Sequence, residues 1–141
     1  MQLAPKNLQY ITTALLQKTN VYKYYNKNPD NLRISDCVCR AISTATGLNY
    51  TAVDKLLELT AKEYSCDKLC VCCYHNLLDD ILGYERHYCN HDETVEILAK
   101  MYPRDTIIVR IEGHLTTIIK GSILDIWDCS QEFVDCFWFV T

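Results

Sequence analysis

The feature that most constrains the fold of this chain is a change of hydrophobic pattern at Pro103. Before it, apolar residues recur at helical spacing, and after it come short β-branched runs. The first pattern predicts helices over 5–18, from Ser35 or Asp36 to Gly47, from about Thr51, over 75–82 and over 92–101. The second predicts strands over 106–111, 115–119, 123–127 and 133–140. Helices first and strands second predict an α+β fold, with N-terminal helices packed on a C-terminal antiparallel β-sheet.

Length and composition predict one domain over 1–141, with a mainly helical part (1–102) and a sheet part (103–141). Glycine and proline are scarce, so no linker divides the chain. No apolar run is long enough to cross a membrane, and residues 1–5 lack the features of a signal peptide. We therefore expect a soluble, cytoplasmic protein with no membrane partner. A net charge of -4 without lysine or arginine runs gives no support for nucleic-acid binding.

Nine cysteines are many for a chain of 141 residues. Their number is odd and no secretion signal accompanies them, so a disulfide scaffold is the weaker interpretation. Catalysis, metal binding and small apolar packing remain as roles.

Cys37 has the setting of a catalytic thiol, because it lies in the first turn of the helix predicted to end at Gly47. Unpaired N–H groups and the helix dipole favour a thiolate there, and the same N–H groups can bind an oxyanion. Cys39, two positions on, points away from that site. Arg40 is either a helix-packing cation or the partner of an acid that holds this helix, and we favour a structural role.

His114 is the best candidate for the base, since it follows Gly113 and opens a strand. If Lys120-Gly121 is a two-residue turn, then Thr116 faces Asp125 and His114 faces Trp127. All four side chains then share one face of the hairpin, and Asp125 lies diagonal to His114. Asp128 falls on the opposite face and is the reserve candidate, because a shift of one residue would exchange the two.

A cysteine on a helix, then a histidine on a strand and an acid or amide on the next strand, resembles the order in papain-like and transglutaminase-like thiol enzymes. Asp125-Ile126-Trp127 is similar to the papain-type Asn followed two residues later by a shielding Trp. The stretches 36–42, 113–116 and 125–128 resemble small papain-fold proteins of bacteria and their phages. The resemblance covers the chain from about Asn26, and it implies a bacterial or, for a phage protein, host-cell cytoplasm.

The sequence also departs from papain itself. The residues around Cys37 are not the Cys-Gly-Ser-Cys-Trp signature. The resemblance places the oxyanion-hole amide six residues before the nucleophile, where this chain has Asn31. Asn31, Asn28 and Asn26 are all candidates for the second oxyanion donor.

A second group of residues has the side chains of zinc ligands: Cys66, Cys70, Cys72, Cys73 and His75, followed by Cys89 and His91. Their spacing is irregular and does not repeat as two Cys-x-x-Cys pairs. Packing is therefore the favoured role for these cysteines, and a zinc-stabilised domain is an alternative.

These residues predict a cysteine peptidase or amidase that acts on a peptide or protein amide through a thioester, with no cofactor. The alternative from another class is a papain-fold binding module, for example a phage-encoded inhibitor of a host protein. The sequence names neither the substrate nor the oligomeric state.

Overall fold

The structure, a computed structural model, describes residues 21–90 and 92–141, so the helix predicted over 5–18 lies outside the described residues. Its helices are α2 (Cys37–Thr46), α3 (Tyr50–Glu63), α4 (Val71–Asn76), which continues into the π-helical turn η1 (Leu77–Ile81), and α5 (Val95–Met101). Among the described residues, no helix has the length and apolar character needed to cross a membrane.

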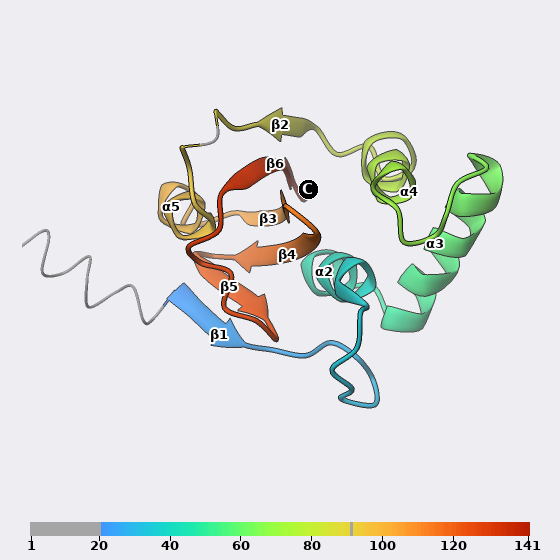
Figure 1. Cartoon of the computed structure of the whole chain (residues 1–141), viewed down its shortest axis with the longest axis horizontal. Helices are drawn as coiled ribbons and strands as arrows, with labels where there is room; N and C mark the ends of the chain where they lie inside the picture. Colours follow the sequence, from blue (N-terminus) through green and yellow to red (C-terminus); the bar gives the residue numbers. More distant parts are fainter. Residues whose placement is uncertain (1–20, 91) are drawn as a thin grey trace, which may run out of the picture.

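A six-stranded sheet forms the centre of the molecule (Figure 1). Its strands are β1 (Tyr22–Tyr24), β2 (Arg86–Tyr88), β3 (Thr106–Ile111), β4 (His114–Ile119), β5 (Ser122–Asp125) and β6 (Val134–Phe139). They lie in the order β1-β5-β4-β3-β6-β2. β1 is parallel to β5, and every other neighbouring pair is antiparallel.

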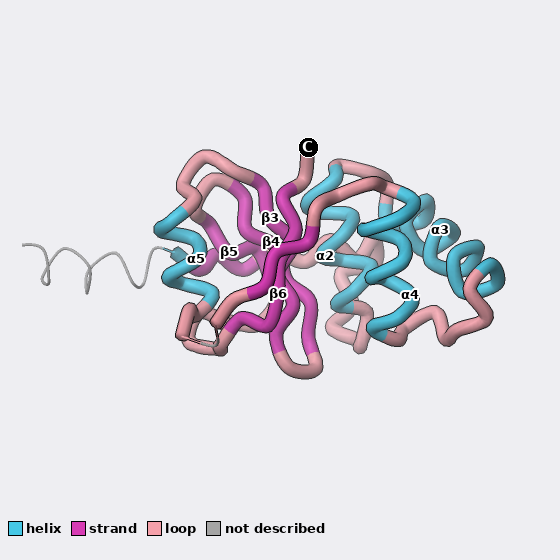
Figure 2. Tube along the Cα trace, turned by 90° about the horizontal axis from the view of Figure 1, so that it is seen from above, coloured by secondary structure: helices cyan, strands magenta, loops and turns pink. Residues whose placement is uncertain are grey.

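Helices cover both faces of the sheet, with α5 on one side and α2, α3 and α4 on the other (Figure 2). Successive strand side chains point to opposite faces, so β3 divides its apolar residues between two cores. Ile107 and Val109 pack toward α5, whereas Ile108 packs with α2, α3 and α4. Both faces of β3 are therefore buried, which explains its continuous apolar run.

The α+β class is confirmed, and the four strands of 103–141 pair antiparallel as predicted, but they form only part of the sheet. The sheet is mixed, and two of its strands, β1 and β2, come from the part predicted to be mainly helical. Each has only three residues and lies at an edge of the sheet. Such short segments show no alternation long enough to distinguish them from loop, and the pairing partner decides their conformation.

Three boundaries also differ from the prediction. The third helix begins at Val71 instead of 75, because the Cys70 side chain caps it by accepting from the Cys73 N–H. The fourth begins at Val95, since Thr94 occupies its N-cap. The strand predicted over 123–127 ends at Asp125.

The β4–β5 hairpin has the predicted register, with Ile119 opposite Ser122. Lys120 and Gly121 have φ of 48° and 78°, as a tight hairpin turn requires. Helix α2 is fixed on this hairpin, because Thr117 Oγ1 donates to the Ala41 carbonyl over 2.6 Å. The helix that carries Cys37 is thereby held against the strand that begins with His114.

The two faces of α3 allow a test of this packing. Leu57 is fully buried in the core between helices and sheet, whereas Leu59 is 50% exposed. We expect Leu57→Ala to lower the free energy of unfolding by about 2–5 kcal/mol, because it leaves a cavity. Leu59→Ala, the same change in the same helix, should cost less than about 0.5 kcal/mol. Urea denaturation measures both, and equal losses would contradict the described orientation of α3.

Candidate active site

Cys37 is the first residue of α2, and the N–H groups at this helix end lack helix partners. The first intrahelical bond runs from the Arg40 N–H to the Asp36 carbonyl, at 3.0 Å. Asp36 occupies the N-cap position, but its side chain makes no capping hydrogen bond. The expected cap is absent because the Asp36 carboxylate is turned toward Arg40, Asn28 and Tyr50. The N–H groups of residues 37–39 are therefore left without an intrahelical acceptor.

His114 lies between Cys37 and Asp125. It follows the two-residue turn that ends in Gly113, whose φ is 67°, and it opens β4. Its Nε2 donates to Asp125 Oδ2 over 2.6 Å. The Cys37 thiol is the other neighbour of the ring, since the two groups line one cleft and each shifts the pKa of the other. The three residues predicted to meet are brought together.

The electrostatics of this group favour a charged pair. Burial alone would lower the pKa of His114, but hydrogen bonds to Asp125 and Cys37 and their charges raise it to about 9. Burial would raise the pKa of the Cys37 thiol, but hydrogen bonds from His114 and the Leu115 backbone outweigh it, and the pKa is lowered. The Arg40 charge acts in the same direction. Both shifts act in the direction of a thiolate beside an imidazolium.

The Asp125 carboxylate is buried and accepts from four donors. Thr116 Oγ1 and His114 Nε2 each donate to Oδ2 over 2.6 Å. The Ile126 N–H donates to Oδ1 over 2.7 Å, and Arg40 Nη1 over 3.1 Å. Burial alone would raise the pKa of Asp125, but these donors and the His114 charge hold it below its ordinary value. Asp125 therefore stays ionised and fixes the orientation of the imidazole.

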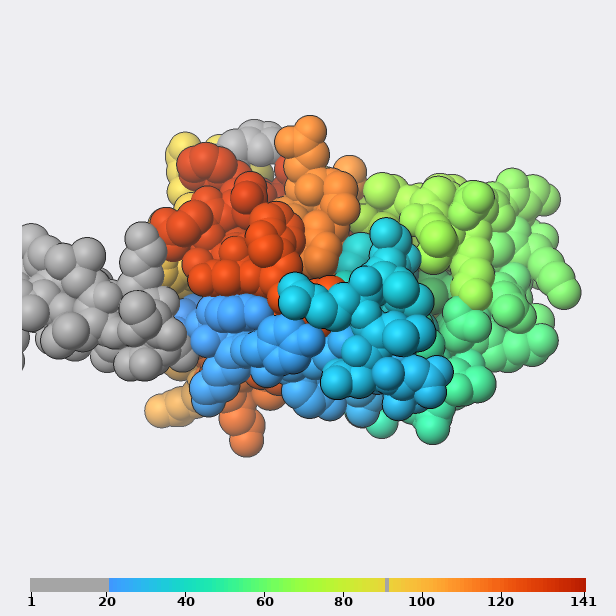
Figure 3. All heavy atoms as spheres, turned by 60° about the horizontal axis from the view of Figure 1, so that its bottom comes forward, coloured from blue at the N-terminus to red at the C-terminus, as the bar shows by residue number. Residues whose placement is uncertain are grey.

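Arg40 connects the two ends of the site. Its Nε donates to Asp36 Oδ1 over 2.6 Å, while its Nη1 reaches Asp125. Asp36 also accepts from Tyr50 and Asn28, at 2.8 and 2.9 Å. The loop before α2 and the segment around Asp125 are far apart in the sequence, but they pack together on one face of the molecule (Figure 3). The favoured structural role of Arg40 thus has a definite form, a bridge between two carboxylates.

The backbone of Asp125 is supported by the strand that the sequence did not reveal. The Tyr25 N–H and the Tyr22 hydroxyl both donate to the Asp125 carbonyl, at 2.9 and 3.1 Å. β1 therefore holds the end of β5 in place. Tyr22 and the tyrosines after it favour β-structure, but the run is too short to predict the strand without its partner.

The structure distinguishes Asp125 from Asp128 as the acid that contacts His114. Asp125 holds His114, whereas Asp128 is exposed and its Oδ1 accepts from the Ser130 N–H. Trp127 packs edge-on against the His114 ring, with centroids 5.1 Å apart. It remains 44% exposed, so its indole covers the imidazole on the solvent side.

The three asparagines proposed as oxyanion donors lie in the loop before α2. The Nδ2 of Asn26 donates to the Leu32 carbonyl, and that of Asn28 donates to Asp36, each over 2.9 Å. Both amides thus organise the loop and the Arg40 network. Asn31 is exposed and has a left-handed backbone, with φ of 57°.

A cleft of about 170 Å³ opens beside Cys37 and His114. It can hold roughly six water molecules or a similar volume of substrate. Leu69, Val71 and Tyr74 give it an apolar wall, and Arg110 contributes a cation. The register of β3 against β6 shifts between Arg110 and Ile111, which is a β-bulge. The bulge bends the end of β3 at the cleft. The sequence carried no signal for the role of Arg110.

Two groups of three residues among those described have side-chain atoms close enough to hold a metal ion. One is His114, Asp125 and Cys129, and the other is Cys66, Cys70 and Cys72. In the first, His114 and Asp125 already bond each other, and burial raises the pKa of Cys129 to about 12. That thiol, missed by sequence reasoning, lies neutral beneath the pair.

The other residues of the predicted zinc group have different surroundings. Cys73 is buried and donates its thiol to the Leu57 carbonyl. His75 contacts Arg86 and Arg110, and burial with these two charges lowers its pKa to about 4. Cys89 packs against the core on the α5 side of the sheet. His91 lies outside the described residues.

No protein-family model, curated protein or solved structure matches this chain. The contacts among Cys37, His114 and Asp125 are what supports a function for it.

Arg40 gives the first test of the site. We expect Arg40→Ala to lower the free energy of unfolding at pH 7 by about 3–5 kcal/mol, because it leaves two buried carboxylates without their cation. Lys55→Ala, which removes an exposed partner of Glu58, should cost less than about 1 kcal/mol. Urea denaturation provides both values.

The cost of Arg40→Ala should also depend on pH. Burial alone would raise the pKa of Asp36 and Asp125, but their donors lower it from the ordinary 3.8. The lowered pKa values of the two carboxyl groups stabilise the folded protein above about pH 4. This stabilisation is lost as the pH falls through their pKa values in the folded protein. The difference between the wild-type protein and Arg40→Ala should therefore narrow below pH 4. A constant difference would show that Arg40 does not act through these carboxylates.

Proposed function

We propose that the protein is a cysteine-dependent hydrolase of papain-like type, a peptidase or amidase with Cys37 as nucleophile. The observation that carries the proposal is the position of His114, which is hydrogen-bonded to Asp125 and lies beside the Cys37 thiol in the same cleft. His114 acts as acid and base, and Asp125 positions it. Nine free cysteines fit a reducing compartment, such as the cytoplasm of a bacterium or of a phage host.

The reaction proceeds in two halves. The Cys37 thiolate attacks the carbonyl carbon of an amide, and the protonated Nδ1 of His114 gives its proton to the leaving amine as the C–N bond breaks. The resulting thioester is then attacked by water, whose proton returns to His114. Loss of the carboxylic acid restores the thiolate and the imidazolium.

The oxyanion of each tetrahedral intermediate needs donors beside the sulfur. The N–H groups at the start of α2 suit this role, because they have no helix acceptor and the positive end of the helix dipole lies there. Asn31 stays the candidate for a second donor, since the amides of Asn26 and Asn28 are engaged elsewhere.

The cleft supports a peptide or protein amide as substrate. Leu69, Val71 and Tyr74 suit an apolar side chain, and Arg110 suits a carboxylate or carbonyl further along. The small volume of the cleft fits one or two side chains of an extended substrate.

The thiolate gives a direct chemical test. At pH 6 we expect iodoacetamide to alkylate Cys37 on the order of tenfold faster than glutathione. A lower pKa increases the thiolate fraction more than it reduces the nucleophilicity of the thiolate. His114→Ala should shift the pH midpoint of this alkylation up toward about 8.5. Peptide-resolved mass spectrometry measures the rate at each cysteine, and Cys89→Ser serves as the control with an unchanged Cys37 profile.

Hydrolysis must accompany this reactivity. A peptide library incubated with the protein should be cleaved, and Cys37→Ala should abolish the cleavage while it leaves the thermal transition in place. A Cys37 that reacts like glutathione at every pH would refute the nucleophile. A reactive Cys37 without any amide cleavage would favour the binding module.

Asp125 and Asp128 form a matched pair for the second test. His114 must be protonated to give a proton to the leaving amine. The hydrolysis rate should therefore fall on the alkaline side of its pH profile near pH 9, and this fall is the alkaline limb. Asp125→Asn removes the charge that raises the pKa of His114, so this limb should move down by about one unit or more. We also expect kcat to fall by roughly 10²–10⁴.

Asp128→Asn, which changes an exposed side chain, should leave both the limb and kcat unchanged. Equal effects of the two substitutions on the pH profile would contradict the assignment of Asp125.

A further inference from the structure

We infer that Cys66, Cys70 and Cys72 form a zinc site at the junction of α3 and α4. Their three sulfur atoms all lie within 4.8 Å of one another. Zinc binds thiolates at about 2.3 Å in tetrahedral geometry, which places the sulfurs about 3.8 Å apart. A contraction of about 1 Å at most therefore brings all three sulfurs onto one ion.

The end of α3 delivers the first sulfur. Ser65 has a left-handed backbone with φ of 52°, and the Cys66 N–H donates back to the Ala61 carbonyl over 3.0 Å. This reversal turns Cys66 from the end of α3 toward the start of α4. Residues that are four and six positions apart in sequence thus meet, although their spacing matches no common zinc motif.

Two of the sulfurs accept N–H hydrogen bonds. The Cys73 N–H donates to Cys70 Sγ over 3.3 Å, and Asn76 Nδ2 donates to Cys72 Sγ over 3.4 Å. Such outer contacts orient metal-bound ligands and stabilise the thiolate form. The sulfurs therefore have the surroundings of ligands and not only of apolar packing groups.

The neighbours of these sulfurs limit the site to three protein ligands. The Cys73 thiol is buried and directed to the Leu57 carbonyl, and His75 is engaged by Arg86 and Arg110. Cys72 is exposed, so the fourth position would be open to solvent and could take a water molecule. Lys68, whose charge would oppose the ion, is instead paired with Asp54 and Glu58.

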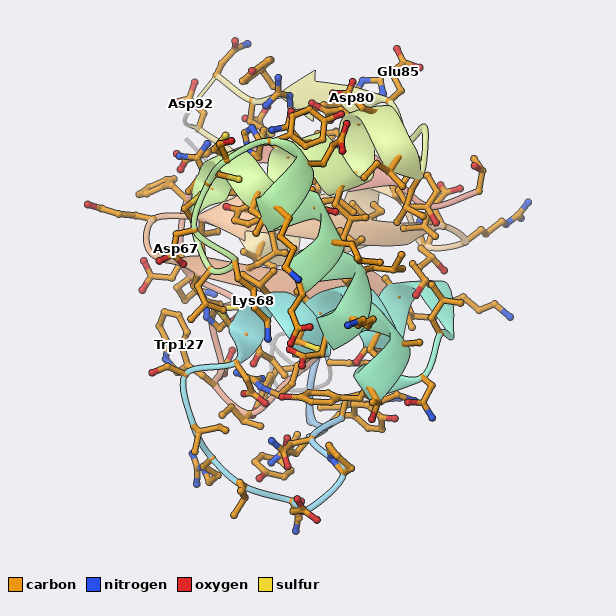
Figure 4. All side chains as sticks on the ribbon, turned by 90° about the vertical axis from the view of Figure 1, so that its right-hand side faces the viewer. Asp67, Lys68, Asp80, Glu85, Asp92 and Trp127 are labelled. Carbon is orange, nitrogen blue, oxygen red and sulfur yellow. The ribbon has the colours of Figure 1, made fainter. Side chains whose placement is uncertain are left out.

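The site would brace one wall of the cleft, a consequence that rests on the proposed hydrolase function. Leu69 and Val71 lie between the three cysteines in sequence and line the cleft beside Cys37. Asp67 marks this loop in Figure 4, on the same side of the view as Trp127. Zinc would hold the loop, and with it the two apolar side chains that meet the substrate.

The test uses the full chain with Cys37→Ala, so that the catalytic thiol is no ligand and no hydrolytic activity is needed. After purification in a reducing buffer without chelator, elemental analysis should find one zinc per chain. Cobalt added to the metal-free protein should give a sulfur-to-metal charge-transfer band. Zinc should also raise the thermal transition of the metal-free protein.

Cys66→Ser and Cys72→Ser in this background should each weaken zinc binding by about a hundredfold or more and remove the thermal shift. The exposed Cys72 is the sharper test, because its substitution disturbs no core packing. Cys89→Ser, which removes a cysteine outside the group, should bind zinc unchanged. Absence of zinc binding, retention of zinc by Cys72→Ser, or a disulfide among the three in reducing buffer would overturn the inference and leave the hydrolase proposal standing.

Discussion

One buried guanidinium holds the site together. Arg40 bonds Asp36 before α2 and Asp125 at the end of β5, so a single cation joins the helix that carries the thiol to the strand that carries the acid. Buried carboxylates are tolerated only when paired and hydrogen-bonded, and the planar fork of arginine can serve two at once. The same contact draws the Asp36 side chain away from the helix N-terminus. The ion pair therefore both anchors Asp125 and leaves the N–H groups beside Cys37 uncovered.

The charges explain why the pKa shifts favour an ionised cysteine-histidine pair. With a thiolate on Cys37 and a neutral His114, the site would hold three anions and one cation, and Arg40 is already shared by Asp36 and Asp125. Neutral donors offset part of the excess, with Tyr50 and Asn28 on Asp36 and Thr116 on Asp125. The proton on His114 supplies the remaining compensation, which is why its pKa rises despite burial.

The sequence revealed the parts of the site that rest on local rules. Helical spacing placed Cys37 at a helix start, and the Lys120-Gly121 turn set the register that distinguishes Asp125 from Asp128. What it could not reveal depends on distant partners. β1 exists because it pairs with β5, and Cys66 meets Cys70 because Ser65 reverses the chain. By its position, Asp36 is predicted to be an N-cap. It does not cap because its side chain binds Arg40, which also binds Asp125 from 85 residues further along the chain.

The two sides of the cleft are built differently. His114 and Leu115 begin a strand of the sheet and pair with the end of β3, so their positions follow from the sheet. Leu69 precedes α4 in a loop outside the sheet, and the residue is 56% exposed. The reacting atoms and the apolar wall are thus held by separate structures. In the proposed hydrolase, zinc at the 64–70 loop would act on how a substrate is held, while the pKa of Cys37 depends on His114 and Arg40 on the opposite side.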